Sequence, residues 1–470
     1  MHTADETIDA VVLGGGPAGA TAALAMARAG LAVRVCERTR FPRLHLGESF
    51  LPRNLMLLRE LGLESGMRSL PHVEKRGAEF VFGHGRDGRL FPFSGGLVGD
   101  PDEAFSLERA PFDALLLAAA RAAGATVSEA CGVRRILRLE EGRVLVETDD
   151  GERIAARILI DASGQATVVG KHLQTRQVVK DLKRVAYWGH FAGVERRPGI
   201  AGGFTRVAMC DEGWFWIIPL DERRDSIGLV MDAAAARQVD LPPGQMLAWG
   251  IARCPELRRV TARAVHPAAN EVCADFSYSC RPYSGPGYFL AGDAAVFLDP
   301  IFSTGVCLAM MGAAEAARGA IAMLRHGSSP RRVRRRYDRY VEQTSAPFFR
   351  LVRAYYQHSF RELLVQGSGP FSVHKAALSV LAGSVFPRPA WALRWRLALL
   401  LLLMRANRRL PLVPRRERFS LLGDEAAAAA GGERPGLPAA AAGSAAAAAV
   451  AAAAPERAAG GTARPAPPGQ

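Results

Sequence analysis

Trp214, Trp216 and Lys75 are the residues whose types and spacing indicate chemistry most directly. The two tryptophans lie two positions apart in the run Trp-Phe-Trp-Ile-Ile-Pro (214–219), so a strand would place both indoles on one face. Such a pair can pack in a core or can shield a reactive centre. Lys75 is one of only five lysines in a chain whose cations are mostly arginine. An amine can become a neutral nucleophile and a guanidinium cannot, so Lys75 is a candidate catalytic residue, with a surface lysine as the alternative.

A second chemical signal is the run Gly-Asp-Ala-Ala-Val-Phe-Leu-Asp-Pro-Ile-Phe-Ser-Thr-Gly at residues 292–305. Its last part, from Pro300 to Gly305, predicts a turn that opens a helix. Amide groups that converge at a helix start can bind an anion without a fixed cation. The alternative is a turn that is capped by Ser303 or Thr304 and binds nothing.

The N-terminal residues predict a dinucleotide site on a β-α-β unit. Apolar residues 8–13 form the first strand, an alanine-rich segment to about Gly30 forms the helix, and residues 31–36 form the second strand. Glycines in the first turn let the backbone approach a pyrophosphate, and the helix start supplies amide donors. An acid after the second strand accepts from the adenosine ribose and disfavours a 2′-phosphate. The residues expected at this site are Gly14, Gly16, Pro17, Ala18, Gly19 and Glu37.

Two later strands indicate that the dinucleotide is FAD rather than NAD. Residues 158–164 end in Asp-Ala-Ser-Gly, and residues 289–294 end in Ala-Gly-Asp-Ala. Both elements resemble those of flavoproteins of the p-hydroxybenzoate hydroxylase type. The resemblance implies that Asp293 contacts the ribityl and pyrophosphate region of FAD. It also implies a flavin contact for Arg109, with a surface arginine at a helix start as the alternative.

Residues 41–49 carry Phe-Pro-Arg and then Gly-Glu-Ser, which resembles a segment shared by flavin-dependent halogenases and geranylgeranyl-type reductases. This resemblance places Arg43 and Ser49 among the expected FAD contacts and does not separate the two families. Two other patterns favour the halogenases, namely W-x-W-x-I-P at 214–219 and F-x-x-P-x-x-S-x-G at 297–305. The neighbourhood of Lys75, Glu-Lys-Arg-Gly-Ala-Glu-Phe, also resembles that of the halogenases' essential lysine.

The halogenase resemblance implies a role for each motif. Trp214 and Trp216 would fill the space between flavin and substrate and so prevent direct hydroxylation. Lys75 would hold hypohalous acid by a hydrogen bond or capture it as a haloamine. The implied halide-binding residues are Ser303, Thr304 and Gly305, and Pro300 and Gly305 are also expected to contact FAD. The implied cofactors are FAD, supplied as FADH2 by a separate flavin reductase, together with O2 and chloride or bromide.

The residue before Ser303 restricts the expected substrate. Tryptophan halogenases carry a glutamate there, whereas this chain has Phe302 and is shorter than those enzymes. The better resemblance is to the branch that halogenates phenols and pyrroles, so free tryptophan is not the expected substrate. Several members of that branch act on substrates tethered to acyl or peptidyl carrier proteins. An aromatic small molecule, free or carrier-bound, is therefore expected.

The predicted fold is α/β, with a discontinuous Rossmann-like FAD-binding domain, an antiparallel β-sheet substrate domain and a helical C-terminal region. Alternating apolar residues predict strands of the substrate sheet at 184–191, 203–209, 213–220 and 226–231. The expected domains are 1–175 and 281–345 for FAD, the second with the halide site, 176–280 for the substrate sheet, 346–422 for basic helices, and 423–470 for a disordered Ala/Gly/Pro-rich tail.

Composition predicts a soluble cytoplasmic protein. Seven scattered cysteines without a C-x-x-C pattern argue against a disulfide framework or a metal site, and the acidic N-terminus does not resemble a signal peptide. No apolar run approaches the ~20 residues of a transmembrane segment. The net charge of +14 is concentrated at residues 331–339 and 388–418, and Glu417 is the single acid in the second stretch. Few aromatic residues interleave there, so nucleic acid is not an expected partner, whereas an acidic carrier protein, anionic lipid or plain solvent exposure would fit.

Three other functions compete with halogenation. A flavin monooxygenase fits the fold but fits poorly with the paired tryptophans and with the Phe-Ser-Thr-Gly run at 302–305. An isoprenoid-reducing flavoprotein is favoured only by the Gly-Glu-Ser segment and the basic stretch. A flavin-binding protein without activity would not need Lys75. The sequence therefore predicts an oxidoreductase of the halogenase type, acting in secondary metabolism.

Overall fold

The structure, a computed structural model, describes residues 7–97, 102–266, 270–274 and 277–423. All of these residues belong to one compact unit. The expected disordered tail at 423–470 lies outside the described residues, except for Gly423.

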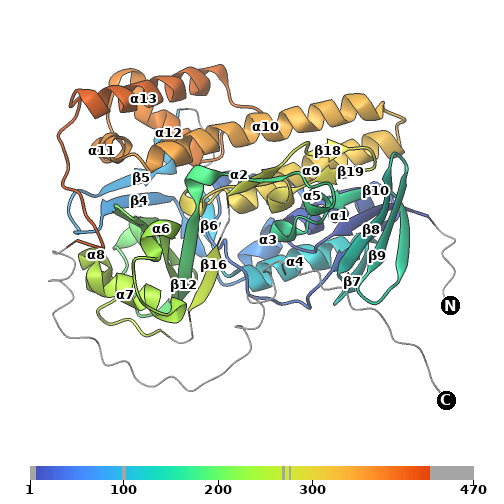
Figure 1. Cartoon of the computed structure of the whole chain (residues 1–470), viewed down its shortest axis with the longest axis horizontal. Coiled ribbons are helices and arrows are strands. Elements are labelled where there is room, and N and C mark those ends of the chain that lie inside the picture. Colours follow the sequence, from blue (N-terminus) through green and yellow to red (C-terminus); the bar gives the residue numbers. More distant parts are fainter. Residues whose placement is uncertain (1–6, 98–101, 267–269, 275–276, 424–470) are drawn as a thin grey trace, which may run out of the picture. The chain divides into compact units, whose positions relative to one another are not determined.

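A mostly parallel sheet carries the glycine-rich turn (Figure 1). β1 (Ile8–Leu13) lies between β2 (Val33–Glu37) and β10 (Arg153–Asp161), and both pairings are parallel. β19 (Tyr288–Leu290) also pairs parallel to β10, although five strands of the second sheet lie between them in sequence. The predicted discontinuous β-α-β architecture is thus present. The sheet is completed by β7 (Thr126–Glu129), β18 (Ser284–Gly285), β8 (Val133–Glu140) and β9 (Arg143–Thr148).

Helices of small residues cover this sheet. α1 (Pro17–Arg28) follows the glycine turn and packs against α4 (Arg109–Ala122) and α9 (Gly305–Leu324). Within the described part of the chain, α9 is the one helix long and apolar enough to cross a membrane, but 56% of that stretch is buried inside the protein. Its contacts with α1 and with α10 (Pro330–Tyr355) explain its apolar surface as that of a core helix.

Seven strands form the second sheet, in the order β16-β12-β15-β14-β13-β4-β5. Four of them match the predicted strands, namely β12 (Arg184–Ala192), β13 (Thr205–Cys210), β14 (Gly213–Pro219) and β15 (Arg224–Asp232). β16 (Glu271–Ala274) forms one edge, and β4 (Gly77–Phe82) and β5 (Arg89–Pro92) form the other. Within 176–280 the strands of this sheet pair antiparallel as predicted. The sequence did not indicate that β4 would enter the sheet from the N-terminal segment and pair parallel to β13.

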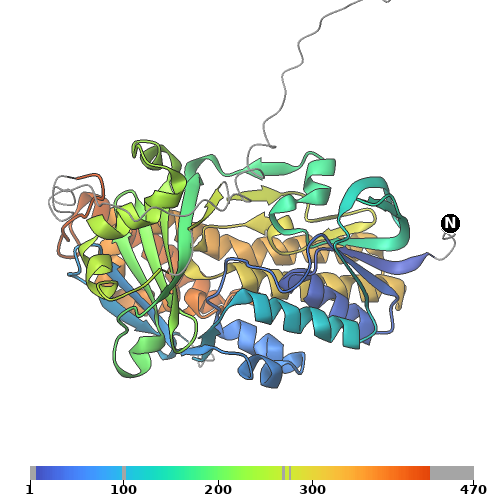
Figure 2. The same ribbon diagram turned by 90° about the horizontal axis from the view of Figure 1, so that it is seen from below.

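The two faces of the second sheet have different surroundings. Trp214 and Trp216 face the large core that the sheet shares with the parallel sheet. Phe215 and Ile217 face a separate core, which α7 (Met246–Arg253) and α8 (Pro255–Val260) cover (Figure 2). Both faces of β14 are therefore buried, which accounts for its uninterrupted apolar sequence.

The helices at the end of the described chain pack against α10. α10 spans the expected domain boundary at 345/346, so a boundary there would cut a helix. It is followed by α11 (His358–Gln366), α12 (Val373–Leu381) and α13 (Trp391–Arg409). The shorter elements are α2 (Pro52–Glu60), α3 (Glu64–Arg68), α5 (Val168–His172), α6 (Ala233–Ala236), β3 (Val73–Lys75), β6 (Ala104–Ser106), β11 (Arg176–Val178), β17 (Tyr278–Cys280) and β20 (Val296–Phe297).

Candidate active site

The glycine turn between β1 and α1 has the geometry that a dinucleotide requires. Gly14 has a φ of +95°, and a Cβ there would lie 2.5 Å from the carbonyl oxygen of Ala162. A Cβ at Gly19 would lie 1.8 Å from the carbonyl oxygen of Gly14. At Gly16, by contrast, an added Cβ would meet only Arg43 Nη2, at 3.1 Å. Gly14 and Gly19 thus shape the turn, while Gly16 faces an arginine across it, where a pyrophosphate would be bound. Pro17 and Ala18 begin α1 directly behind the turn.

Glu37 lies at the end of β2 beside this turn. Its carboxylate accepts hydrogen bonds from the amide of Gly15 at 2.7 Å and from the amide of Thr39 at 2.9 Å. These bonds hold the acid at the carboxyl edge of the sheet, where an adenosine ribose binds in this fold. Oε1 also accepts from the Thr39 hydroxyl at 2.6 Å, whereas Oε2 accepts only from Gly15 and keeps a lone pair for a ribose hydroxyl group.

Arg43 and Arg109 meet at a shared carboxylate. Arg109 is 4% exposed and donates to both oxygens of Asp113, each at 2.8 Å, while Arg43 lies 3.8 Å from the same group. A further hydrogen bond joins Arg109 to the carbonyl oxygen of Leu46 at 2.8 Å. Arg109 begins α4 but is buried, so the alternative of a surface arginine is wrong. Asp113 thus holds both guanidinium groups, and Arg43 is the one that reaches Gly16.

Asp293 is half-buried, whereas the His45 ring reaches solvent but is crowded by the protein around it. Burial raises the pKa of Asp293 to about 7, against the opposing charge of Arg109. Burial and the charge of Arg109 lower the pKa of His45 to about 4, so its imidazole is neutral near pH 7. Sequence reasoning missed His45, although it lies between the two motif residues Arg43 and Gly47.

These groups fit FAD. The glycine turn and the arginine pair suit a pyrophosphate, Glu37 suits a ribose, and the half-buried Asp293 suits a ribityl chain. In the described part of the chain, no three His, Cys, Asp or Glu side chains lie close enough together to hold a metal ion.

The segment Pro300–Gly305 forms a turn that opens α9, as the sequence predicted. Asp299 accepts from the amide of Ile301 at 3.0 Å and caps a short 3-10 turn that ends at Phe302. Ser303 then takes a left-handed conformation, with φ 55°, and α9 begins. The first α-helical hydrogen bond joins the amide of Leu308 to the carbonyl oxygen of Thr304, at 2.9 Å. The amide of Ser303 donates to the carbonyl oxygen of Pro300 at 2.9 Å, so the amides that an anion could use are those from Thr304 onward, and Thr304 makes no side-chain cap that would compete.

Lys75 lies at the end of β3 and is 2% exposed, so the alternative of a surface lysine is wrong. Its Nζ donates to Ser49 Oγ at 2.8 Å and to the carbonyl oxygen of Phe50 at 3.1 Å. Burial lowers the pKa of this amine to about 7. Ser49 Oγ also lies 2.9 Å from Thr205 Oγ1, so the Ser49 hydroxyl is committed to Lys75 and the second sheet. A neutral fraction of the amine is thus available near pH 7.

Trp214 and Trp216 lie on one face of β14 as predicted, with ring centroids 5.9 Å apart. Trp216 Nε1 donates to Ser226 Oγ on β15 at 3.1 Å, and Trp214 Nε1 donates to the hydroxyl of Tyr356 at 3.1 Å. The Tyr356 hydroxyl in turn donates to Asp299. This chain of bonds joins the tryptophan strand to the turn before α9. No sequence pattern marks Tyr356, because its role follows from where α10 ends.

The glycine turn and the arginine pair beside it indicate an FAD-dependent oxidoreductase. Comparisons with known proteins identify the family within that class. The family model described as tryptophan halogenase matches residues 9–101 and 98–363. The chain therefore belongs to the flavin-dependent halogenases, as predicted.

Individual relatives agree with this family. Flavin-dependent halogenase armH4 of Armillaria mellea is 32% identical over 379 residues, covering 74% of this chain and 71% of the relative. The brominase of 1H-pyrrole-2-carbonyl-peptidyl-carrier protein from Pseudoalteromonas luteoviolacea (strain 2ta16) is 30% identical over 327 residues, covering 67% and 78%. The solved flavin-dependent brominase Bmp2 superposes with a TM-score of 0.77 at 25% identity, covering 86% of this chain and 100% of that one. The myxobacterial chondrochloren halogenase CndH gives 0.70 at 29%, covering 87% and 98%. The predicted fold class is confirmed.

We expect Gly16→Val to lose FAD affinity by about tenfold or more while the protein stays folded. The new side chain would meet only the movable Arg43 and would project into the place of the pyrophosphate. Fluorescence titration with FAD measures the affinity, and thermal unfolding of the apoprotein checks the fold. Gly244→Val is the control, because a Cβ at Gly244 meets open space. Normal FAD affinity in Gly16→Val would contradict the assignment of this turn.

We expect Tyr356→Phe to lower the free energy of unfolding by about 1–3 kcal/mol, because Trp214 Nε1 loses its acceptor and Asp299 loses a donor inside the core. Urea unfolding measures the change. Tyr355→Phe is the control, since this neighbouring tyrosine is more deeply buried than Tyr356 and its hydroxyl has no hydrogen-bond partner in the described structure. Equal effects of the two substitutions would show that the hydrogen-bond chain contributes nothing.

Proposed function

We propose that this halogenase chlorinates or brominates an electron-rich phenolic or pyrrolic ring through hypohalous acid held at Lys75. The buried amine with a pKa near 7 is the observation that carries the proposal. A partly neutral amine in a dry environment can hydrogen-bond hypohalous acid or take up its halogen as a haloamine. The anion site at the start of α9 would bind chloride or bromide.

FAD would supply the oxidising chemistry when it is bound in its reduced form with O2. The described chain shows one glycine turn of the dinucleotide type, so we propose that a separate flavin reductase provides FADH2. Trp214 and Trp216, 2% and 3% exposed, would keep the aromatic substrate away from the flavin. We propose that the enzyme acts as a soluble protein of the cytoplasm.

The substrate class is proposed from position 302 and from the relatives. Phe302 is buried and its ring lies 5.9 Å from that of Tyr355, at 82°. No carboxylate stands at this place, in contrast to the glutamate that tryptophan halogenases carry before the Ser-Thr-Gly segment. One relative is named for a pyrrole carried on a peptidyl carrier protein, which supports a carrier-bound or free electron-rich aromatic compound.

We expect Lys75→Ala and Lys75→Arg to keep FAD binding and FADH2 oxidation but to lower organic halogenation by about a hundredfold or more. The amine acts after hypohalous acid has formed, and a guanidinium cannot become neutral at this pH. Protein, FAD, a flavin reductase, NADH and chloride would be incubated with a phenol panel. Chlorine isotope doublets in the mass spectrum then report the product.

The control for this experiment is Lys171→Arg, which changes an exposed lysine in the same way. Halogenation by Lys75→Arg at the wild-type rate would refute the role of the amine. Hydroxylated products without chlorine from the wild-type protein would favour the rival monooxygenase.

Several arginines of the basic stretch at 388–418 are paired with acidic residues, which the sequence did not indicate. Arg415, Arg416 and Arg418 form ion pairs with acids from distant parts of the chain, at 2.8, 2.6 and 3.0 Å. Their partners are Glu362, Asp87 and Asp211. The expectation that nine arginines face a single acid is therefore wrong, because folding brings other acids to the stretch. The exposed arginines that remain are Arg388, Arg394, Arg405, Arg408 and Arg409.

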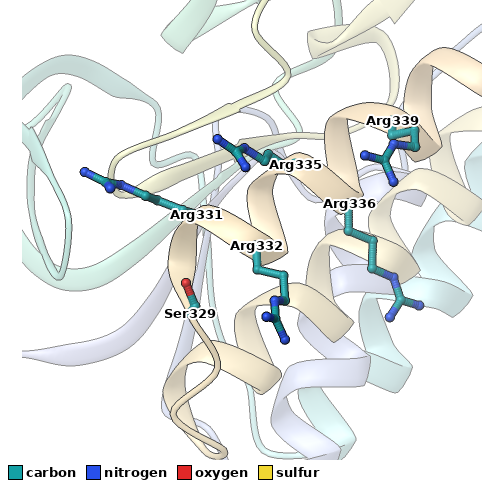
Figure 3. A pocket seen from close by; sticks show the side chains of 6 residues that line it. All are labelled: Ser329, Arg331, Arg332, Arg335, Arg336 and Arg339. Atoms are coloured by element: carbon teal, nitrogen blue, oxygen red, sulfur yellow. The ribbon is translucent and has the colours of Figure 1, made fainter.

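We propose that these five residues of the α13 region, rather than the whole stretch, attract an acidic carrier protein. A second arginine cluster provides an internal control. It surrounds a surface hollow at the first turns of α10 (Figure 3) and consists of Arg331, Arg332, Arg335, Arg336 and Arg339. Tyr356 lies at the opposite end of α10, and a helix of 26 residues is about 39 Å long.

We expect the triple change Arg405→Glu, Arg408→Glu and Arg409→Glu to raise the KM for a carrier-bound substrate about tenfold at low salt, without affecting a free substrate. The effect should fade as ionic strength rises from about 0.05 M to about 0.5 M, because the Debye length shortens. The same number of reversals at Arg331, Arg332 and Arg335 should have little effect. Equal turnover of free and carrier-bound forms, with no salt dependence, would remove the carrier hypothesis.

A further inference from the structure

The formation of hypohalous acid consumes one proton in addition to the hydrogens that reduced FAD carries. Reduced FAD, O2, one halide ion and one proton yield FAD, hypohalous acid and water. Reduced FAD and the halide each give two electrons to O2, the O–O bond breaks, an O–halogen bond forms, and the second oxygen leaves as water. Some group at the site must hand over this proton. In the proposed function Lys75 binds hypohalous acid after it has formed, so a different group is expected to be the proton donor.

Glu48 and His190 form a buried pair that no step described so far uses. Glu48 Oε1 lies 2.6 Å from His190 Nε2, and the Glu48 side chain is 0% exposed against 13% for His190. The second oxygen, Glu48 Oε2, is buried and has no hydrogen-bond partner among the described residues. An unpartnered buried carboxylate oxygen is costly and is typical of a site whose ligand or water completes it.

The pair lies beside the residues assigned to oxidation. His190 on β12 is the direct partner of Ser226 on β15, and Ser226 Oγ accepts from Trp216 Nε1. On the other side, a Cβ at Gly47 would lie 3.6 Å from Val306 Cγ2, one residue beyond the halide segment. Glu48 follows Gly47 directly, so the pair is flanked by the tryptophan strand and by the start of α9.

Glu48 favours the protonated form of the His190 imidazole. Burial alone would lower the pKa of His190, but the hydrogen bond to Glu48 and its charge outweigh burial and raise the pKa above its ordinary value. Glu108 acts in the same direction from α4's first turn, and Arg224 on β15 acts in the opposite one. The imidazolium is 13% exposed, so it can be reprotonated from solvent between turnovers.

We propose that His190, held and charged by Glu48, delivers the proton that hypohalous acid formation consumes. The inference rests on the proposed function and adds a residue pair to it. The N–H bond of the imidazolium breaks, its electron pair stays on nitrogen, and the proton goes to the oxygen atom that leaves as water. Solvent then returns a proton to the neutral imidazole. Glu48 is a positioning residue that acts through His190.

Glu48→Gln separates this role from a structural one. The amide oxygen can still accept from His190 Nε2, so the fold and FAD affinity should be unchanged, but the negative charge is gone. NMR titration of the His190 ring in the apoprotein should show a lower pKa than in the wild type. With FAD, a reductase, NADH and chloride, monochlorodimedone chlorination at about pH 7.5 should fall about a hundredfold. FADH2 oxidation should continue, with O2 reduced to hydrogen peroxide instead of being used for chlorination.

Two further variants sharpen the test. Chlorination by Glu48→Gln should recover as the pH is lowered through the new pKa of His190. His190→Gln should keep the hydrogen bond to Glu48 and show no recovery at any pH. Glu108→Gln is the matched control for a charge that acts without a hydrogen bond, because this acid pairs with Arg224 at 2.9 Å and does not hydrogen-bond His190; it should lower the pKa of His190 and the chlorination rate less than Glu48→Gln does.

The possible outcomes are distinct. Wild-type coupling of FADH2 oxidation to chlorination in both Glu48→Gln and His190→Gln would overturn the inference and leave the proposed function intact. Loss of FAD affinity or of thermal stability in Glu48→Gln would show a structural role and also overturn it. A wild-type protein that forms no hypohalous acid would overturn the proposed function itself.

Discussion

The burial of the Lys75 amine without a carboxylate partner is the constraint on which the rest of the site depends. Removing an ammonium group from water costs several kcal/mol, and a neighbouring carboxylate would offset that cost by keeping the amine charged. The chain gives Lys75 only neutral acceptors, Ser49 Oγ and the carbonyl oxygen of Phe50. The nearest acid in sequence, Glu74, pairs with Arg76 instead. This arrangement spends folding energy to obtain an amine that can react near neutral pH.

A second requirement is that the turn at residues 300–305 and the tryptophans of β14 keep fixed positions relative to each other, although they belong to different elements. The hydroxyl of Tyr356 meets this requirement by joining Trp214 to Asp299, and Asp299 caps the turn that leads into α9. Arg184 lies over the Tyr356 ring, 4.2 Å from its centroid. A cation over the ring and a phenol bonded at both ends fix the end of α10 against both elements. The C-terminal helices therefore belong to the construction of the site, although none of their residues appears in a recognisable motif.

The sequence predicted those parts of the molecule that depend on local spacing. The strand at residues 8–13, the glycine turn and the alternation through Trp214 and Trp216 are local patterns, and the structure has each of them. It could not predict that β4 would pair parallel to β13, since pairing across sequence-distant segments depends on tertiary packing. The partners of Glu48 and Asp299 were missed for the same reason. His190 and Tyr356 are single residues on ordinary elements, and only folding brings them to the motif acids.

Position 302 shows how the packing around a residue limits which side chains could function there. Phe302 is 3% exposed and meets the ring of Tyr355, which also contacts Phe80 on β4. A glutamate introduced here would sit among aromatic rings, where desolvation raises the pKa of a carboxyl and keeps it protonated near neutral pH. It could not serve as a base without further changes that bring polar partners into the same core. The Glu48–His190 pair lies apart from these aromatic rings. In the proposed mechanism, proton transfer would therefore take place beside the start of α9, and Phe302 would contribute only steric bulk.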